Sequence, residues 1–228
     1  MKRFLPFLII AVVLVAALAT AWLLLRSSQQ AGRSTNSPTP ATDSEPPGAE
    51  PPHIRGNPDA RVTLEEFGDF QCPTCGLFSG ELRKIEDEFG ERLRVIFREY
   101  PLYPKPHENA LVAAQAAEAA GLQGQGRFWE MHDKLYENQK SWSEAKDAVP
   151  MFVDYAKQIG LDADRFARDL SGEVVAARIF QDGKRAHALG VTSTPTFFIA
   201  GKEVKGDSFS PEGIREMINK ALRGVPGP

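Results

Sequence analysis

Residues 67–76 read FGDFQCPTCG, and this stretch decides the fold because a strand pattern ends in it and a helical pattern begins. Cys72 and Cys75 are the only two cysteines in the chain. The first N–H groups of a helix have no partner within the helix and the helix dipole is positive there, so a thiolate at Cys72 is favoured over a thiol. The spacing of three residues keeps Cys75 within reach of Cys72. The pattern indicates a redox-active pair, which forms the disulfide Cys72–Cys75 when oxidised.

Two other interpretations of the cysteine pair are a structural disulfide and half of a zinc site. A zinc site usually needs four ligands, but the sequence has no second cysteine pair. The four histidines are scattered without ligand spacing: His53, His107, His132 and His187. A bridge that closes so short a loop restricts the unfolded chain little, so stabilisation alone is a poor reason for it. Redox chemistry is favoured, and we expect no metal and no cofactor.

The composition is that of an ordinary globular protein. With 42% hydrophobic and 25% charged residues, the 228-residue chain can bury one good core with a smaller second domain. A net charge of −3 and the lack of a basic cluster interleaved with aromatic residues argue against nucleic-acid binding.

The N-terminal segment, residues 1–26, is predicted to be a transmembrane anchor. From Phe4 to Leu25 the chain is apolar apart from Pro6 and Thr20, which is long enough to cross a bilayer. A signal peptide is the alternative, but the apolar run continues past the small residues that could form a cleavage site. Basic residues flank both ends of the apolar run, so their distribution does not decide the orientation in the membrane. The thiol pair decides it, because disulfides persist in oxidising compartments outside the cytoplasm. We therefore expect a single-pass protein of the cell membrane, with a cytoplasmic N-terminus and an extracytoplasmic catalytic domain.

Residues 27–53 are rich in Ser, Thr, Gln, Pro and Glu and have almost no large apolar side chain. This composition predicts a disordered linker, and its prolines favour an extended, semi-stiff spacer between the membrane and the domain.

The folded domain is expected to begin near Ile54. A strand over 61–67, a helix over 73–89 and a strand over 93–97 make a βαβ unit, whose two strands are parallel in a right-handed crossover. Residues 54–106 are thus the first part of an α/β domain.

Residues 107–190 contain no strand candidate and are predicted to be an inserted, all-helical subdomain. Its helices are expected at 108–120, 127–137, 149–159, 164–170 and 174–189.

The strand pattern returns in residues 191–224, the second part of the domain. A hairpin over 196–205 is followed by a helix that Ser210 caps and Pro211 opens. The order of elements is βαβ, helical insertion, ββα.

Two motifs carry a resemblance to a known family: EFGDFQCPTC at 66–75 and GVTSTPTFFI at 190–199. Over residues 54–222 the chain resembles the DsbA-like thioredoxin family, and within it the membrane-tethered, BdbD-like branch. The resemblance implies that Cys72 is the exposed nucleophile, that Cys75 resolves the mixed disulfide, and that a loop proline with a cis peptide bond, Pro195, lies opposite them. It also implies substrate-binding positions at Thr194, Pro73 and Thr74.

Glu66 matches the position of a buried acid that assists proton transfer at the second thiol in this family. The alternative is a strand acid that merely reaches solvent. Thr74 replaces the histidine of the best-known oxidase motif, so the sequence does not decide how strong an oxidant the Cys72–Cys75 pair is.

The function implied by the resemblance is disulfide exchange on exported proteins with free thiols. A membrane quinone-linked reoxidase of the DsbB or VKOR type is the implied redox partner, and we expect a monomer. A disulfide reductase or isomerase of the same fold is the first alternative, although the linker cannot supply the dimerisation domain that such isomerases usually carry. A metal chaperone or thiol-dependent binding module is the second.

Overall fold

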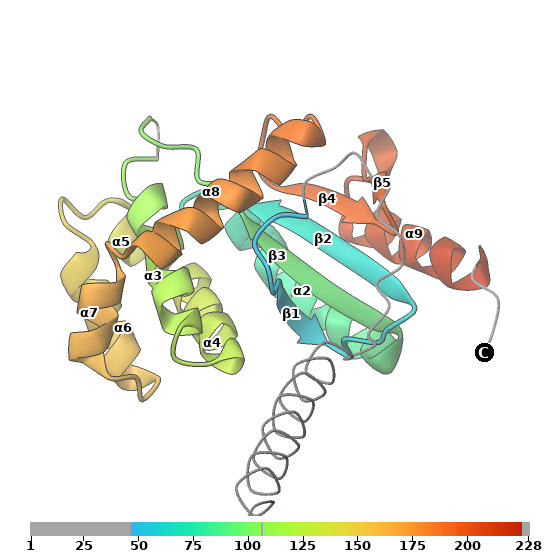
Figure 1. Ribbon diagram of the computed structural model, residues 1–228. Helices are drawn as coiled ribbons and strands as arrows, with labels where there is room; N and C mark the ends of the chain where they lie inside the picture. The colour runs from blue at the N-terminus through green and yellow to red at the C-terminus, as the bar shows by residue number, and fades with distance from the viewer. Residues whose placement is uncertain (1–46, 106, 225–228) are drawn as a thin grey trace, which may run out of the picture. The chain divides into compact units, whose positions relative to one another are not determined.

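A computed structural model describes residues 47–105 and 107–224 (Figure 1). In chain order the strands and α-helices are β1 (His53–Gly56), β2 (Val62–Gly68), α2 (Pro73–Phe89), β3 (Leu93–Glu99), α3 (Ala110–Gly121), α4 (Gln125–Glu137), α5 (Gln139–Ser143), α6 (Val149–Gln158), α7 (Ala163–Asp169), α8 (Glu173–Ala188), β4 (Thr196–Ile199), β5 (Lys202–Glu203) and α9 (Pro211–Gly224). Within these residues no helix is long and apolar enough to cross a membrane. The predicted anchor over 1–26 and the linker up to residue 46 lie outside the described residues.

The sheet has five strands in the order β1-β3-β2-β4-β5. The β2 and β3 strands are parallel, as the βαβ prediction requires, and the other three pairings are antiparallel. In this register Glu66 of β2 lies between Phe97 of β3 and Phe197 of β4, so its side chain emerges at the centre of the sheet. The predicted order βαβ, helical insertion, ββα is confirmed.

Helices cover both faces of the sheet, with α2 and α9 on one face and α8 on the other (Figure 1). A small cluster under α8 joins Phe67 and Phe198 of the sheet to Ala186 and Val191. The larger cluster joins the opposite face of the sheet to α2, α9 and the insertion without a break. The insertion therefore shares its core with the strands that carry the thiols.

Helix α3 lies at the centre of the insertion and is buried nearly all round. Its small side chains let α4 and α8 approach closely, and a helix that is apolar nearly all round is typically buried. Its buried alanines are Ala110, Ala113, Ala114, Ala116, Ala117, Ala119 and Ala120.

The predicted helices and strands agree with the observed ones to within two residues at each end for most elements. Pro73 opens α2 and Gly90 follows its last residue, as predicted. Ser210 caps α9, because its Oγ accepts from the Gly213 N–H at 3.1 Å. Two short elements were not predicted, β1 and α5, and the second strand of the hairpin is shorter than expected.

The predicted disordered linker over 27–53 is wrong at its C-terminal end. Arg98 donates to the carbonyl oxygens of residues 47 and 49 at 2.9 and 2.8 Å, and Asp182 accepts from the N–H of residue 49 at 2.8 Å. Arg178 donates to the carbonyls of residues 50 and 51 at 3.3 and 3.1 Å, and Gln125 donates to that of residue 52 at 3.2 Å. We call residues 47–52 the strap. It packs through backbone hydrogen bonds, which a composition poor in apolar residues does not reveal.

Candidate active site

Cys72 is the residue that caps the N-terminus of α2. Its backbone is extended, with φ −69° and ψ 120°, while Pro73 occupies the first helical position. The N–H of Gly76 donates to the Cys72 carbonyl at 3.1 Å, which is the first hydrogen bond of the helix. Cys75 follows one turn later, so both sulfurs lie at the positive end of the helix dipole.

Both cysteines are free thiols in this structure and both are buried. Cys75 is fully covered and Cys72 is 7% exposed. The exposed nucleophile that the resemblance implies is therefore nearly covered here, because the loop before β4 lies against it. The Cys72 thiol donates to the Thr194 carbonyl, with 3.4 Å between sulfur and oxygen.

The two thiols differ sharply in acidity. A hydrogen bond from the Cys75 thiol is the largest influence on Cys72, and backbone N–H groups of the first turn add to it, so the pKa of Cys72 falls from 9.0 to about 5 despite burial. Burial, reinforced by the hydrogen bond to Cys72 and the charge of Glu66, raises the pKa of Cys75 well above 9.0. At neutral pH the reduced pair is a thiolate at Cys72 beside a protonated Cys75.

Glu66 lies in the sheet beside the thiols, and it is only 3% exposed. Its Oε1 has no hydrogen-bond partner among the residues that the structure describes. Burial raises the pKa of Glu66 to about 8, although the charge of Arg55 opposes the rise. Glu66 is therefore not a strand acid that reaches solvent. Its role in proton transfer at the second thiol stays a prediction.

The loop before β4 brings residues from far along the chain to Cys72. The Thr194–Pro195 peptide bond is cis, as predicted, and Pro195 is buried at the start of β4. The remaining predicted positions, Pro73 and Thr74, are exposed on the first turn of α2. The structure thus gathers Cys72, Thr194 and these two residues around one sulfur.

The insertion also reaches the thiol loop, through contacts that the sequence did not predict. Gln139 of α5 donates to the carbonyl oxygens of Phe70 and Cys72. Gln71 donates to the Ser143 carbonyl at 2.8 Å and accepts from the Asn109 N–H at 2.7 Å. No local pattern marks these amide side chains, because each contact depends on how the insertion packs.

The histidines are structural where they are buried. His132 packs edge-on against Phe70 and Phe97, and burial lowers its pKa to about 4. His53 lies 2.9 Å from a carboxylate oxygen of Glu118. Over residues 47–105 and 107–224, no group of three or more His, Cys, Asp or Glu side chains could hold a metal ion.

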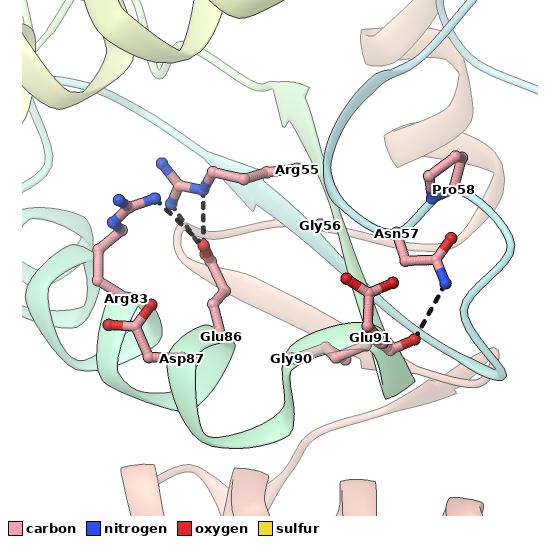
Figure 2. A pocket seen from close by; sticks show the side chains of 10 residues that line it. Arg55, Gly56, Asn57, Pro58, Arg83, Glu86, Asp87, Gly90 and Glu91 are labelled. Carbon is pink, nitrogen blue, oxygen red and sulfur yellow. Dashed lines mark hydrogen bonds and ion pairs between the residues drawn. The ribbon is translucent and has the colours of Figure 1, made fainter.

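A surface cavity of about 480 Å³ lies at the opposite end of α2 from the thiols. Figure 2 shows Arg55 and Arg83 converging on Glu86 at its edge. Arg55 also pairs with Asp133 of α4 at 2.8 Å, so this group ties β1 to two helices. The cavity holds no thiol and is separate from the redox site.

The family model described as Thioredoxin matches residues 49–220. The solved structure of oxidised BdbD from Bacillus subtilis is 26% identical, with a TM-score of 0.68 over 82% of this chain and 98% of that one. A thioredoxin-like oxidoreductase from Silicibacter pomeroyi is 28% identical, with a TM-score of 0.63 over 75% of this chain and 92% of that one. The chain belongs to the thioredoxin family. It is a DsbA-like thioredoxin-fold protein, so the class of thiol:disulfide oxidoreductase predicted from the sequence is confirmed.

Curated relatives with similar sequences carry a different name. A Na⁺/H⁺ antiporter NhaA 1 of Salinispora arenicola is 39% identical over 173 residues, which are 76% of this chain and 25% of that protein. Another of that name from Mycolicibacterium gilvum is 38% identical over 68% of this chain and 24% of its own length. The chain thus spans about a quarter of the length of these relatives.

Proposed function

We propose that this protein is an extracytoplasmic oxidase that introduces disulfides into exported proteins by exchange through Cys72 and Cys75. The observation that carries the proposal is the split between the two thiols. One is stabilised as a thiolate at a helix N-terminus, and the other is a buried, protonated thiol one turn away.

The reaction begins with the oxidised pair. A substrate thiolate attacks the Cys72 sulfur, the Cys72–Cys75 bond breaks, and the Cys75 sulfur leaves with the bonding electron pair and takes up a proton. A second substrate thiolate then attacks the substrate sulfur of the mixed disulfide, which releases Cys72 as a thiolate. Two electrons pass from the substrate dithiol to the pair, and the substrate gains a disulfide.

Glu66 is the proposed source of the proton that Cys75 takes up. A buried carboxylic acid with a pKa of about 8 keeps its proton at neutral pH. The charge of ionised Glu66 raises the pKa of Cys75, so the two groups are not ionised together. When Cys75 must attack in the reverse step, the Glu66 carboxylate accepts its proton.

The direction of exchange follows from the acidity of Cys72. A low thiol pKa stabilises the reduced form relative to the disulfide, so the oxidised pair is a stronger oxidant than one with ordinary thiols. The same stability makes Cys72 a good leaving group from the mixed disulfide. Because Thr74 supplies no charge, the proposed oxidant is intermediate in strength.

The proposed setting is the outer side of the cell membrane. The apolar run from Phe4 to Leu25 supports a membrane anchor, and similarity to part of proteins named antiporters supports a membrane-associated role. Each cycle leaves two electrons on the pair, so a second protein must remove them. We assign the removal of these electrons to a quinone-linked membrane reoxidase of the DsbB or VKOR type. The proposed oxidase acts as a monomer.

Equilibration of the full chain against glutathione buffers tests the proposal. We expect a reduction potential well above that of thioredoxin, which is about −270 mV, and net oxidation of a reduced, unfolded test protein. A reduction potential as low as that of thioredoxin would contradict the assignment as an oxidase and favour a disulfide reductase. Tight, stoichiometric binding of copper or zinc to the reduced pair, without exchange, would favour the binding module instead.

A further inference from the structure

One amide side chain of the insertion reaches directly into the thiol loop. Gln139 is the first residue of α5, and its Nε2 donates to the carbonyl oxygens of Phe70 and Cys72 at 2.7 and 2.9 Å. The two N–H bonds of the amide are thereby both used on backbone acceptors.

The Cys72 carbonyl is also the acceptor that starts α2. It receives the Gly76 N–H at 3.1 Å, and a carbonyl oxygen has lone pairs for both donors. With its oxygen held between Gln139 and the helix, the Cys72 peptide cannot rotate freely. This orientation leaves the N–H groups of Thr74 and Cys75 to act on the Cys72 sulfur.

Gly76 makes the space for the Gln139 amide. A Cβ at residue 76 would lie 2.6 Å from Gln139 Oε1, a distance that Cβ atoms essentially never show, and 3.1 Å from its Cδ, which is also a tight contact. Gly76 lies within α2 and is not among the glycines with a positive φ, so its backbone does not require glycine. Glycine destabilises a helix interior relative to alanine. Space for the amide is the structural reason for glycine here.

We propose that Gln139 is a positioning residue for the exchange reaction, that it holds the Cys72 peptide so that the first-turn N–H groups face the sulfur, and that Gly76 admits its amide. The inference rests on the proposed function only in assuming that the orientation of the Cys72 peptide serves thiol–disulfide exchange. It also makes α5 the part of the insertion that acts on the reactive thiol.

Three variants of the reduced full chain separate hydrogen bonding from shape. Gln139→Met keeps the side-chain length and removes the hydrogen-bond donor, Gln139→Ala removes both, and Lys140→Ala changes the exposed neighbour as a control. The readout is the rate at which iodoacetamide alkylates Cys72 between pH 3.5 and 8. Because weakening a first-turn N–H hydrogen bond to the Cys72 thiolate raises the pKa of Cys72 by roughly half a unit to one unit, both Gln139 variants should react about three to ten times more slowly at pH 4. The Lys140 variant should match the wild type.

A double-mutant cycle tests the part of Gly76. Gly76→Ala should push the amide off both carbonyls and reproduce the slow alkylation of Gln139→Ala. The double variant should then be no slower than either single one, because both changes remove the same contact. Additive effects, or a Gly76→Ala variant that reacts like the wild type, would overturn the assignment.

The two proposals fail separately. Alkylation uses no protein substrate. If the wild type does not oxidise test proteins, the proposed oxidase function is contradicted, but the alkylation result for Gln139 still holds. If the Gln139 variants unfold at a lower temperature but keep the wild-type alkylation profile, Gln139 only stabilises the fold and the positioning role is wrong.

Discussion

Replacing Glu66 with glutamine should change how the stability of the protein depends on pH. Burial raises the pKa of this carboxyl from 4.5 to about 8. Between those two values the unfolded chain has lost a proton that the folded chain keeps. The contribution of Glu66 to stability is therefore full below pH 4.5 and is lost as the pH rises toward 8.

The size of this effect follows from the pKa values. One unit corresponds to about 1.4 kcal/mol, and about 2.5 units lie between the unfolded value and pH 7. The wild type should thus lose about 3 kcal/mol from Glu66 alone between pH 4.5 and pH 7. Glutamine does not ionise, so the Glu66→Gln variant should not show this loss.

Urea denaturation of the reduced protein at several pH values measures the effect, with tryptophan fluorescence as the signal, since Trp129 and Trp142 are both buried. The difference between the two proteins is the useful quantity, because titrating groups that do not interact with Glu66 contribute equally to both. Glu137→Gln, at an exposed position of α4, is the matched control. Curves for wild type and Glu66→Gln that stay parallel within about 1 kcal/mol from pH 4.5 to 8 would show that Glu66 is not protonated in the folded protein.

Three further predictions concern the thiols, the strap and the anchor. Cys75→Ser should accumulate mixed disulfides with exported proteins on non-reducing gels, whereas Cys72→Ser should trap few; equal trapping would reverse their roles. Arg98→Met should lower the free energy of unfolding by about 3–5 kcal/mol, measured by denaturation, because the buried carboxylates of Glu65 and Asp182 each lose one cationic partner. A loss under 1 kcal/mol would mean that those charges are compensated elsewhere. The full chain should stay with membranes after carbonate extraction because of residues 4–25, and a soluble mature protein would contradict this.

The thiol site was predictable because its signals are local. The cysteine spacing, Pro73 at the first helical position and Gly90 after the last are all read from neighbouring residues, and α2 has the predicted bounds. The strand patterns on either side then allow only a few topologies. Even the burial of Glu66, which the sequence left open, follows once its strand is placed at the centre of the sheet.

The contacts from the insertion were not predictable in the same way. Gln139 opens a helix of five residues, too short to show a period, and its partners lie about seventy positions away in the chain. The edge strand β1 was missed because it has only four residues, and its polar side chains pair with groups elsewhere, as His53 does with Glu118. Polar contacts of this kind leave no hydrophobic pattern.

The strap has a mechanical consequence under the proposed membrane attachment, in which the residues before it tether the domain. Any pull along that tether enters the fold at residue 47 and meets the bonds from Arg98, Asp182 and Arg178 before it reaches the edge strand. Because these groups belong to β3 and α8, the load spreads to the middle of the domain. We therefore expect β1 to be shielded from being peeled away under such a pull.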